Sequence, residues 1–371
     1  MSDIEIGLGK RGRSALSFDD IAIAPSRRTR APELVSTAWQ IDAYRFDTPI
    51  IGAPMDSVIS PETAIALGKL GGLGVLNLEG LWTRYEDPTA AFEEICALPE
   101  PQANARMQQL YAAPVQPDLV AERIATIRAA GVTVAGSLPP NRVPELAPIV
   151  LRAGVDLFVV RGTTVSAEHV SHGPEALNLK DFIYSLDAPV IVGGVATYRA
   201  ALHLMRAGAA GVLVGFGGGA THTTADVLGV RVPMATAVAD VAAARRDYMD
   251  ESGGRYVHVI ADGAMGRSGD IVKAVACGAD AVMVGSPLAR AVEAPGRGWH
   301  WGMEAVHAEL PRGERHWTGT VGSLAQIING PSRVPDGTMN LVGALRRAMA
   351  TSGYSELKEF QRVDVTVSPT R

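Results

Sequence analysis

Residues 210–224 read Ala-Gly-Val-Leu-Val-Gly-Phe-Gly-Gly-Gly-Ala-Thr-His-Thr-Thr, a short apolar run that passes directly into a glycine-rich loop. The run ends at Val214, and the next ten residues contain four glycines, three threonines and one histidine. Glycine is the usual residue where a backbone must turn sharply or approach a ligand closely. A strand that ends in such a loop predicts a binding loop rather than a simple connection.

The same arrangement, a short apolar run that ends in glycine or a small or polar residue, recurs eight times along the chain. The runs are Pro49–Ala53, Gly72–Leu76, Val132–Gly136, Val155–Arg161, Pro189–Gly194, Ala210–Gly215, His258–Gly263 and Ala281–Ser286. Between them lie stretches with helical periodicity, namely Pro61–Leu70, Asp118–Ala130, Arg199–Ala207 and Gly269–Ala276. Eight buried strands that alternate with helices predict an α/β fold, the (β/α)8 TIM barrel. A doubly wound sheet also alternates strands and helices, so the count of eight decides the prediction.

Two segments interrupt this alternation, residues 77–131 after the second strand and residues 287–353 after the eighth. Loops of this length in a compact barrel are usually functional or carry small elements of their own. Neither is long enough for a well-sized extra domain, and no linker divides the chain. Residues 1–371 are therefore expected to form a single domain.

Composition narrows the classes of function. The chain has 371 residues, of which 47% are hydrophobic, and a net charge of −5 with both signs scattered. Binding to nucleic acid or to a membrane surface is therefore not expected. The two cysteines, Cys96 and Cys277, lie far apart and show no metal-ligand spacing, so a disulfide framework is not expected either. The first residues are polar, and no apolar run reaches membrane-spanning length. We expect a cytoplasmic protein.

The predicted ends of strands seven and eight carry polar groups that suit a ribose phosphate. Strand seven ends in Asp262-Gly263. The carboxylate of Asp262 can accept hydrogen bonds from a ribose diol, and Gly263 offers an open backbone N–H. Strand eight ends in Gly285-Ser286, an N–H and a hydroxyl. The loops after these strands form the usual phosphate site of such barrels. The alternative is structural, with Asp262 capping a helix and Gly285-Ser286 forming a tight turn.

The glycine-rich loop itself has three interpretations. A dinucleotide-binding fingerprint is the weakest, because no helix begins within the loop. A flexible turn is the simplest alternative. The third is a loop that offers carbonyls of Gly217, Gly219 and His222 to a monovalent cation such as K⁺, and N–H groups to a phosphate. His222 is the only ionisable group in the loop, and a lone histidine is more often a structural hydrogen-bonding residue than a catalyst.

Several motifs, in order along nearly the whole chain, resemble the IMP dehydrogenase/GMP reductase family. They are Ser17-Phe18-Asp19-Asp20, Ala53-Pro54-Met55-Asp56-Ser57-Val58, Gly71-Gly72-Leu73-Gly74, Asp262-Gly263 with Ser268-Gly269-Asp270-Ile271, Val282-Met283-Val284-Gly285-Ser286 and Glu293-Ala294-Pro295-Gly296. The pair of CBS domains that the dehydrogenases insert between strands two and three is missing. The chain is most similar to a short IMP dehydrogenase-related branch without that pair.

The resemblance implies roles for individual residues. It implies catalytic positions at His222, Thr224 and Arg315, and cofactor-binding positions at Arg161, Gly215 and Gly217. The substrate-binding positions that it implies are Met55, Gly219, Ala220, Asp262, Gly263, Gly285 and Ser286. In the family, a cysteine of the loop after strand six attacks C2 of the purine, and an ungapped alignment places His222 there. The chain departs from the family at three further positions. Arg161 replaces an aspartate that contacts the nicotinamide ribose, and Ala225 replaces an arginine. The segment Arg315-His316-Trp317 lacks the tyrosine of the family's Arg-Tyr pair.

Three functions follow as expectations. The first is oxidation of IMP to XMP with NAD. The second is reduction of GMP to IMP with NADPH, which the missing CBS pair and an Arg161 able to meet a 2′-phosphate favour. The third is purine-nucleotide binding without turnover, because imidazole is a poor replacement for a thiolate nucleophile. A flavin-dependent barrel is a weaker fourth. The expected partners are IMP, GMP or XMP, with NAD or NADP and K⁺ as cofactors, in a homo-oligomer.

Overall fold

Eight parallel strands close into a barrel, which confirms the predicted fold. The computed structural model describes residues 3–100, 102–170 and 177–368. The strands are hydrogen-bonded in the circular order of the chain: β6 (Ile50–Gly52), β7 (Leu73–Asn77), β8 (Ala135–Leu138), β9 (Leu157–Arg161), β10 (Val190–Val195), β11 (Gly211–Val214), β12 (His258–Asp262) and β13 (Ala281–Val284). Each overlaps one of the eight apolar runs, although β8 begins three residues after the run that starts at Val132. The apolar run begins earlier than the strand because Val134, which precedes β8, is also buried.

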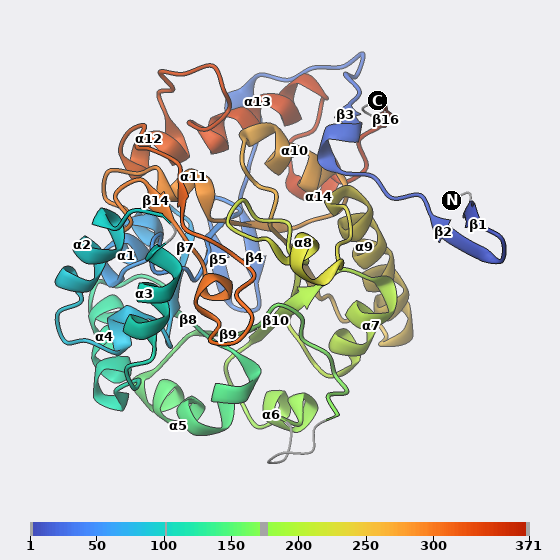
Figure 1. Ribbon diagram of the computed structural model, residues 1–371. Coiled ribbons are helices and arrows are strands. Elements are labelled where there is room, and N and C mark those ends of the chain that lie inside the picture. Colours follow the sequence, from blue (N-terminus) through green and yellow to red (C-terminus); the bar gives the residue numbers. More distant parts are fainter. Residues whose placement is uncertain (1–2, 101, 171–176, 369–371) are drawn as a thin grey trace.

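Helices surround the barrel, as Figure 1 shows in a view close to its axis. They are α1 (Pro61–Lys69), α4 (Pro117–Ala129), α5 (Val143–Ala153), α6 (Leu179–Tyr184), α7 (Tyr198–Arg206), α9 (Met234–Glu251) and α10 (Ser268–Ala276). Local sequence fixes their starts: the hydroxyl of Ser60 accepts from the backbone N–H of Thr63 at 3.1 Å, and Pro61 follows as the first helical residue. On α7, Ala201, Leu204 and Met205 form the buried face.

The two long loops carry small elements of their own. After β7 come η3 (Leu81–Thr83), α2 (Thr89–Ala97) and α3 (Gln102–Tyr111). After β13 come α11 (Ser286–Ala289), β14 (Trp299–His300), η5 (Met303–Val306), β15 (His316–Trp317), α12 (Leu324–Asn329), α13 (Leu341–Thr351) and α14 (Leu357–Phe360). Residues of both loops share one apolar cluster separate from the barrel core, in which Tyr111 and Trp301 meet. The indole N–H of Trp301 donates to the Tyr111 hydroxyl at 2.9 Å, so the loops support each other beside the barrel.

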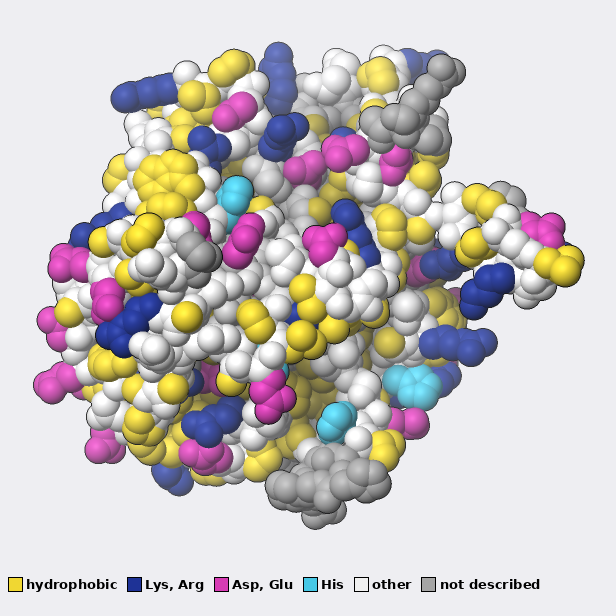
Figure 2. All heavy atoms as spheres, viewed as in Figure 1, with side chains coloured by type: hydrophobic (Ala, Val, Ile, Leu, Met, Phe, Trp, Pro, Cys, Tyr) yellow, Lys and Arg dark blue, Asp and Glu magenta, His cyan; other side chains and the backbone are white. Residues whose placement is uncertain are grey.

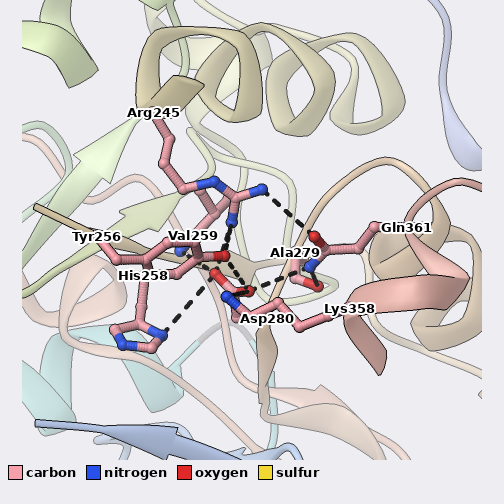
Figure 3. A network of polar contacts seen from close by, with 8 residues as sticks. All are labelled: Arg245, Tyr256, His258, Val259, Ala279, Asp280, Lys358 and Gln361. Atoms are coloured by element: carbon pink, nitrogen blue, oxygen red, sulfur yellow. Dashed lines mark hydrogen bonds and ion pairs between the residues drawn. The ribbon is translucent and has the colours of Figure 1, made fainter. Parts of the chain in front are cut away.

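The amino-terminal end of the barrel is closed by the hairpin β4 (Trp39–Ile41) and β5 (Tyr44–Phe46) and by a polar network around Asp280. Figure 3 shows Arg245 and Tyr256 directed at this carboxylate, each with a hydrogen bond of 2.7 Å. Burial would raise the pKa of Asp280, but Arg245 and Lys358 outweigh burial and lower it. Buried polar groups that are satisfied in this way stabilise a fold, and in TIM barrels this face serves stability.

Shorter elements complete the chain. They are β1 (Asp3–Gly7), β2 (Lys10–Arg13), η1 (Phe18–Asp20), β3 (Ile21–Ile23), η2 (Pro32–Leu34), η4 (Pro140–Arg142), α8 (Thr224–Leu228) and β16 (Val365–Val367). Strands β3 and β16 pair near the two ends of the chain. The hairpin of β1 and β2 projects from the body, as Figure 1 shows. Over the described ranges of the chain, no helix is long and apolar enough to cross a membrane.

Candidate functional site at the carboxyl ends of the strands

A cavity of about 420 Å³ lies at the carboxyl ends of the barrel strands. Its walls come from the loops after β6, β9, β11, β12 and β13, together with Ser17, Phe18 and Asp19 before the barrel. This is the end at which TIM barrels bind ligands, and the volume lies in the range of small-molecule sites. The cavity is therefore the candidate ligand-binding site, and the polar network around Asp280 lies at the opposite end of the barrel.

The glycine-rich loop after β11 packs backbone to backbone against the loop after β12. A Cβ on Gly215 would lie 1.8 Å from the Asp262 carbonyl oxygen, so no other residue fits there. Gly217 has a φ of +59°, and a Cβ on it would lie 2.8 Å from the Cβ of Thr224. The carbonyl of Gly218 accepts from the N–H of Ala264 at 3.0 Å. These glycines therefore bring the two loops into direct contact at the cavity wall.

His222 lies in this loop, and a segment from the far end of the chain holds it in place. It forms an antiparallel bridge with Gly313, and the N–H of Thr223 donates to the Arg312 carbonyl at 3.0 Å. The His222 N–H donates to the Gly219 carbonyl at 3.1 Å. His222 lines the cavity with a side chain that is 11% exposed, and within the described ranges its buried Nδ1 has no hydrogen-bond partner. The loop is thus held between two segments, with its histidine at the cavity.

Glu304 is the main residue that sequence reasoning missed. Its Oε2 lies 3.8 Å from His222 Nε2, its side chain is 9% exposed, and Oε2 has no hydrogen-bond partner among the residues that the structure describes. Burial would raise the pKa of Glu304, but His222, Arg161 and Arg312 together lower it, so the group stays a carboxylate at neutral pH. No spacing in the sequence marks a glutamate in the long segment after the eighth strand as part of this site.

Arg161 and Asp262 form an ion pair inside the cavity. The Arg161 Nε lies 3.0 Å from Asp262 Oδ2, and the two side chains are 14% and 15% exposed. Burial would lower the pKa of Arg161, but Asp262 and Glu304 outweigh burial and raise it. Arg161 thus lines the cavity and its guanidinium holds Asp262, while the cofactor-binding role that the resemblance implies stays a prediction.

A histidine and a methionine pack against the turn after β13. A Cβ on Gly285 would lie 3.1 Å from His300 Nε2 and 3.3 Å from Met55 Sδ, so the glycine permits close packing there. Ser57 Oγ lies 3.1 Å from His300 Nδ1. Burial lowers the pKa of His300 to about 3, which makes its ring neutral at physiological pH. His300 is among the residues that line the cavity.

A second cavity of about 450 Å³ adjoins the first. It lies at the ends of β7, β8 and β9, where Asn77, Ser137 and Arg161 line it. Four residues line both cavities, namely Arg161, Gly162, Thr163 and Glu304. Two ligands bound side by side would therefore meet at Glu304.

Eleven predicted site residues line the first cavity together. They are Met55, Arg161, Gly215, Gly217, Gly219, Ala220, His222, Asp262, Gly263, Gly285 and Ser286. Arg231 and Arg267 also line it, and sequence reasoning missed both. Neither Cys96 nor Cys277 lines it, and burial raises the pKa of Cys277 to about 11. Over the described parts of the chain, no cluster of three or more His, Cys, Asp or Glu side chains is arranged to hold a metal ion.

Thr224 and Arg315 are not among the residues that line this cavity. Thr224 is buried beneath Gly217. The Arg315 guanidinium stacks on Trp299 at 3.8 Å from the ring centroid and donates to the carbonyls of Ile95 and Leu98. Its side chain is 1% exposed. In this structure the donors of Arg315 join the loops after β7 and β13, and the catalytic role that the resemblance implies for it stays a prediction.

Known proteins resemble this chain over nearly all its length. The model of the IMP dehydrogenase / GMP reductase domain matches residues 15–370. An uncharacterized oxidoreductase of Mycolicibacterium smegmatis is 55% identical, covering 98% of this chain and 99% of its own. One of Mycobacterium tuberculosis is 54% identical, with the same coverage. The crystal structure of an IMP dehydrogenase/GMP reductase-like protein from Corynebacterium glutamicum superimposes with a TM-score of 0.95 at 51% identity, covering 99% of this chain and 98% of that one. The chain belongs to the IMP dehydrogenase/GMP reductase family.

Proposed function

We propose that this protein is an oxidoreductase that binds a purine nucleoside monophosphate in the first cavity and exchanges a hydride with a nicotinamide cofactor. The observation that carries the proposal is that Met55, Asp262, Gly285 and Ser286 meet the loop of His222 in one cavity. Family membership and relatives named oxidoreductases support the reaction class. Oxidation of IMP to XMP with NAD is the reaction that the family resemblance implies first, and reduction of GMP to IMP with NADPH is its alternative.

The cavity offers groups for each part of a nucleotide. Asp262 retains Oδ1 for a ribose hydroxyl while Oδ2 holds Arg161. The open N–H groups of Gly263 and Ser286 suit a phosphate, as do the exposed guanidinium groups of Arg231 and Arg267 at the rim. A site for an anionic ligand is therefore present at the loops after β12 and β13.

The second cavity suits the nicotinamide end of the cofactor. Glu304 and Arg312 line it, and among the described residues the buried Glu304 Oε2 and Arg312 Nε have no hydrogen-bond partner, as expected where a ligand completes the pairing. A bound nicotinamide would accept or supply a hydride. Arg161, Thr163 and Glu304 line both cavities and would contact both ligands where they meet.

A monovalent cation stays a proposal as well. The Gly219 carbonyl already accepts from the His222 N–H, which leaves one lone pair for an ion. Turnover with K⁺ replaced by a large organic cation tests this: loss of rate without K⁺ supports the ion, and an equal rate excludes it.

Nucleotide binding without turnover is the second candidate, because neither Cys96 nor Cys277 is among the described residues that line the cavity. The absorbance of reduced nicotinamide decides between the two. Purified protein is incubated with IMP and NAD⁺, and in parallel with GMP and NADPH. A steady change in either mixture supports the oxidoreductase and identifies its direction. Flat traces from protein that still binds a nucleotide would overturn turnover and favour the second candidate.

A further inference from the structure

A third cavity, of about 280 Å³, lies at the amino-terminal end of the barrel between α9 and α14, beside the residues that precede β12 and β13. Four cationic side chains line this α9–α14 pocket, and none of the described residues in its wall is acidic. The four are Arg245, Arg246, Lys358 and Arg362. The whole chain has a net charge of −5, so this concentration of positive charge departs from the overall balance.

One carboxylate, that of Asp280, forms all the ion pairs of these four cations over the described parts of the chain. It lies 2.7 Å from Arg245 Nη1 and 3.7 Å from Lys358 Nζ. It also accepts three further hydrogen bonds, so little of its capacity as an acceptor remains. A single negative charge therefore faces four positive charges. Arg246 and Arg362 are left without a charged partner among the described residues.

Arg245 forms the buried floor of the pocket, with a side chain that is 7% exposed. Its Nη2 carries two N–H donors. Among the described residues, this nitrogen makes one long hydrogen bond of 3.4 Å, to Oε1 of Gln361, which Figure 3 shows. Gly278 leaves the nitrogen uncovered, because a Cβ at that position would lie only 3.9 Å from it. One N–H of a buried guanidinium therefore remains for a ligand.

The ring of Tyr256 holds two of the cations in place. Lys358 Nζ lies 3.2 Å from the ring centroid, and Arg245 Cζ lies 4.9 Å from it, so both cations interact with the same ring. Burial lowers the pKa of Lys358, and Arg245 lowers it further, although Asp280 opposes both effects. A bound anion would offset this repulsion between the cations.

We propose that the α9–α14 pocket binds a phosphate group, either free or carried by a small metabolite. Phosphate oxygens accept several charge-assisted hydrogen bonds at once, and guanidinium groups match their geometry. Arg245 would contact the group at the floor, and the exposed side chains of Arg246 and Arg362 would contact it at the rim. The bound group would join α9 to α14. This site is independent of the proposed function, because it shares no residue with the first cavity.

Isothermal titration calorimetry with pyrophosphate as the probe tests the site, with sodium chloride keeping the ionic strength constant. The double variant Arg246→Ala/Arg362→Ala removes two exposed side chains and leaves the network around the buried carboxylate intact. Its dissociation constant for pyrophosphate should be at least about tenfold higher than that of wild-type protein. Arg231→Ala/Arg267→Ala, at the rim of the first cavity, is the matched control. A binding event that persists in the control and is lost in the first variant assigns the site.

Thermal unfolding gives a second measurement, because a ligand that binds only the folded protein raises its Tm. Pyrophosphate should raise the Tm of wild-type protein and of the control, but not that of Arg246→Ala/Arg362→Ala. Tighter binding of glycerol 3-phosphate than of inorganic phosphate would support a phosphorylated metabolite, and equal binding would support free phosphate.

Three results would overturn the proposal. The first is an absence of pyrophosphate binding by wild-type protein. The second is an Arg246→Ala/Arg362→Ala variant that binds as wild-type protein does, which would indicate that the cations interact only with the carbonyl-bearing ends of α10 and α14. The third is tighter binding of citrate than of pyrophosphate at this pocket, which would assign it to carboxylates.

Discussion

The Arg161 guanidinium lies 3.0 Å from the carboxylate of Asp262 and joins the ends of β9 and β12 across the mouth of the barrel. The pair is largely buried, so removal of either charge leaves the other without its partner in a low-dielectric site. The carboxylate also keeps one oxygen for a ligand. The same contact therefore shapes the cavity and limits how far Arg161 can take part in cofactor binding.

Asp262→Ala should weaken nucleotide binding. We expect the dissociation constant of GMP or IMP to rise about tenfold or more, since a hydrogen bond to a charged acceptor is lost. Calorimetric titration measures the change. The double variant Arg161→Met/Asp262→Ala is the control, because it removes the unpaired buried arginine as well. If it regains thermal stability but not affinity, Asp262 contacts the ligand directly, whereas restored affinity would contradict that contact.

His222→Cys should create or raise turnover. The substitution places a thiol at the loop position where the family resemblance predicts the nucleophile, and a thiolate attacks carbon far better than imidazole. Nicotinamide absorbance is expected to change about tenfold faster or more than in wild-type protein, and mass spectrometry should detect a nucleotide adduct on residue 222. His222→Ala should show neither effect. A folded His222→Cys variant that binds nucleotide but forms no adduct would count against the placement of C2.

Arg267→Ala should weaken the binding of GMP only by removing a contact with its phosphate. The side chain is exposed at the cavity rim, so the expected loss of affinity for GMP is modest, roughly fivefold, and smaller at high salt. Affinity for guanosine, which lacks the phosphate, should not change. Arg199→Ala, an exposed substitution on α7, is the matched control. Equal losses for nucleotide and nucleoside would place the phosphate elsewhere.

Stability should fall in acid because of His258. Burial lowers the pKa of His258 from 6.5 to about 4, although Asp280 opposes this shift. The ring is thus neutral in the folded protein, while the unfolded chain takes up a proton below pH 6.5. The stabilisation is present above pH 6.5 and is lost as the pH falls toward 4. From pH 7 to pH 5 the loss should be roughly 1–2 kcal/mol.

Denaturant unfolding of wild-type protein and of His258→Asn at the two pH values measures this contribution. The variant removes the titrating ring, so its free energy of unfolding should change less between pH 7 and pH 5. An identical change in both proteins would show that other groups set the acid sensitivity.

The hairpin β1–β2 is expected to contribute to self-association. Residues 4–11 are exposed, including the apolar side chains of Ile4, Ile6 and Leu8. Figure 2 shows hydrophobic side chains on the protrusion at the right of the molecule. An isolated two-stranded hairpin is marginally stable, so contact with a second copy of the chain would stabilise it. Light scattering should find an oligomer that becomes smaller when residues 3–13 are deleted. An unchanged oligomer would exclude the hairpin from the interface.

Much of the fold was predictable because the barrel strands are buried on both faces and are therefore continuous apolar runs. Asp262 and Gly285 follow the ends of those runs, so both could be assigned to the same end of the barrel, since all parallel strands end on one side. Glu304 was not predictable, because only the folding of the long segment after β13 brings it beside His222. The same holds for Arg315, whose stacking on Trp299 depends on how the two long loops meet. The periodicity of apolar residues predicts helices and strands, but it does not predict contacts between loops.

The most direct test of the account is a crystal structure of the protein grown with GMP. We expect the nucleotide in the first cavity, with its ribose on Asp262, its phosphate at Gly263 and Ser286, and C2 of guanine beside His222 and Glu304. An empty cavity at saturating nucleotide, or a nucleotide bound elsewhere on the molecule, would contradict the central claim.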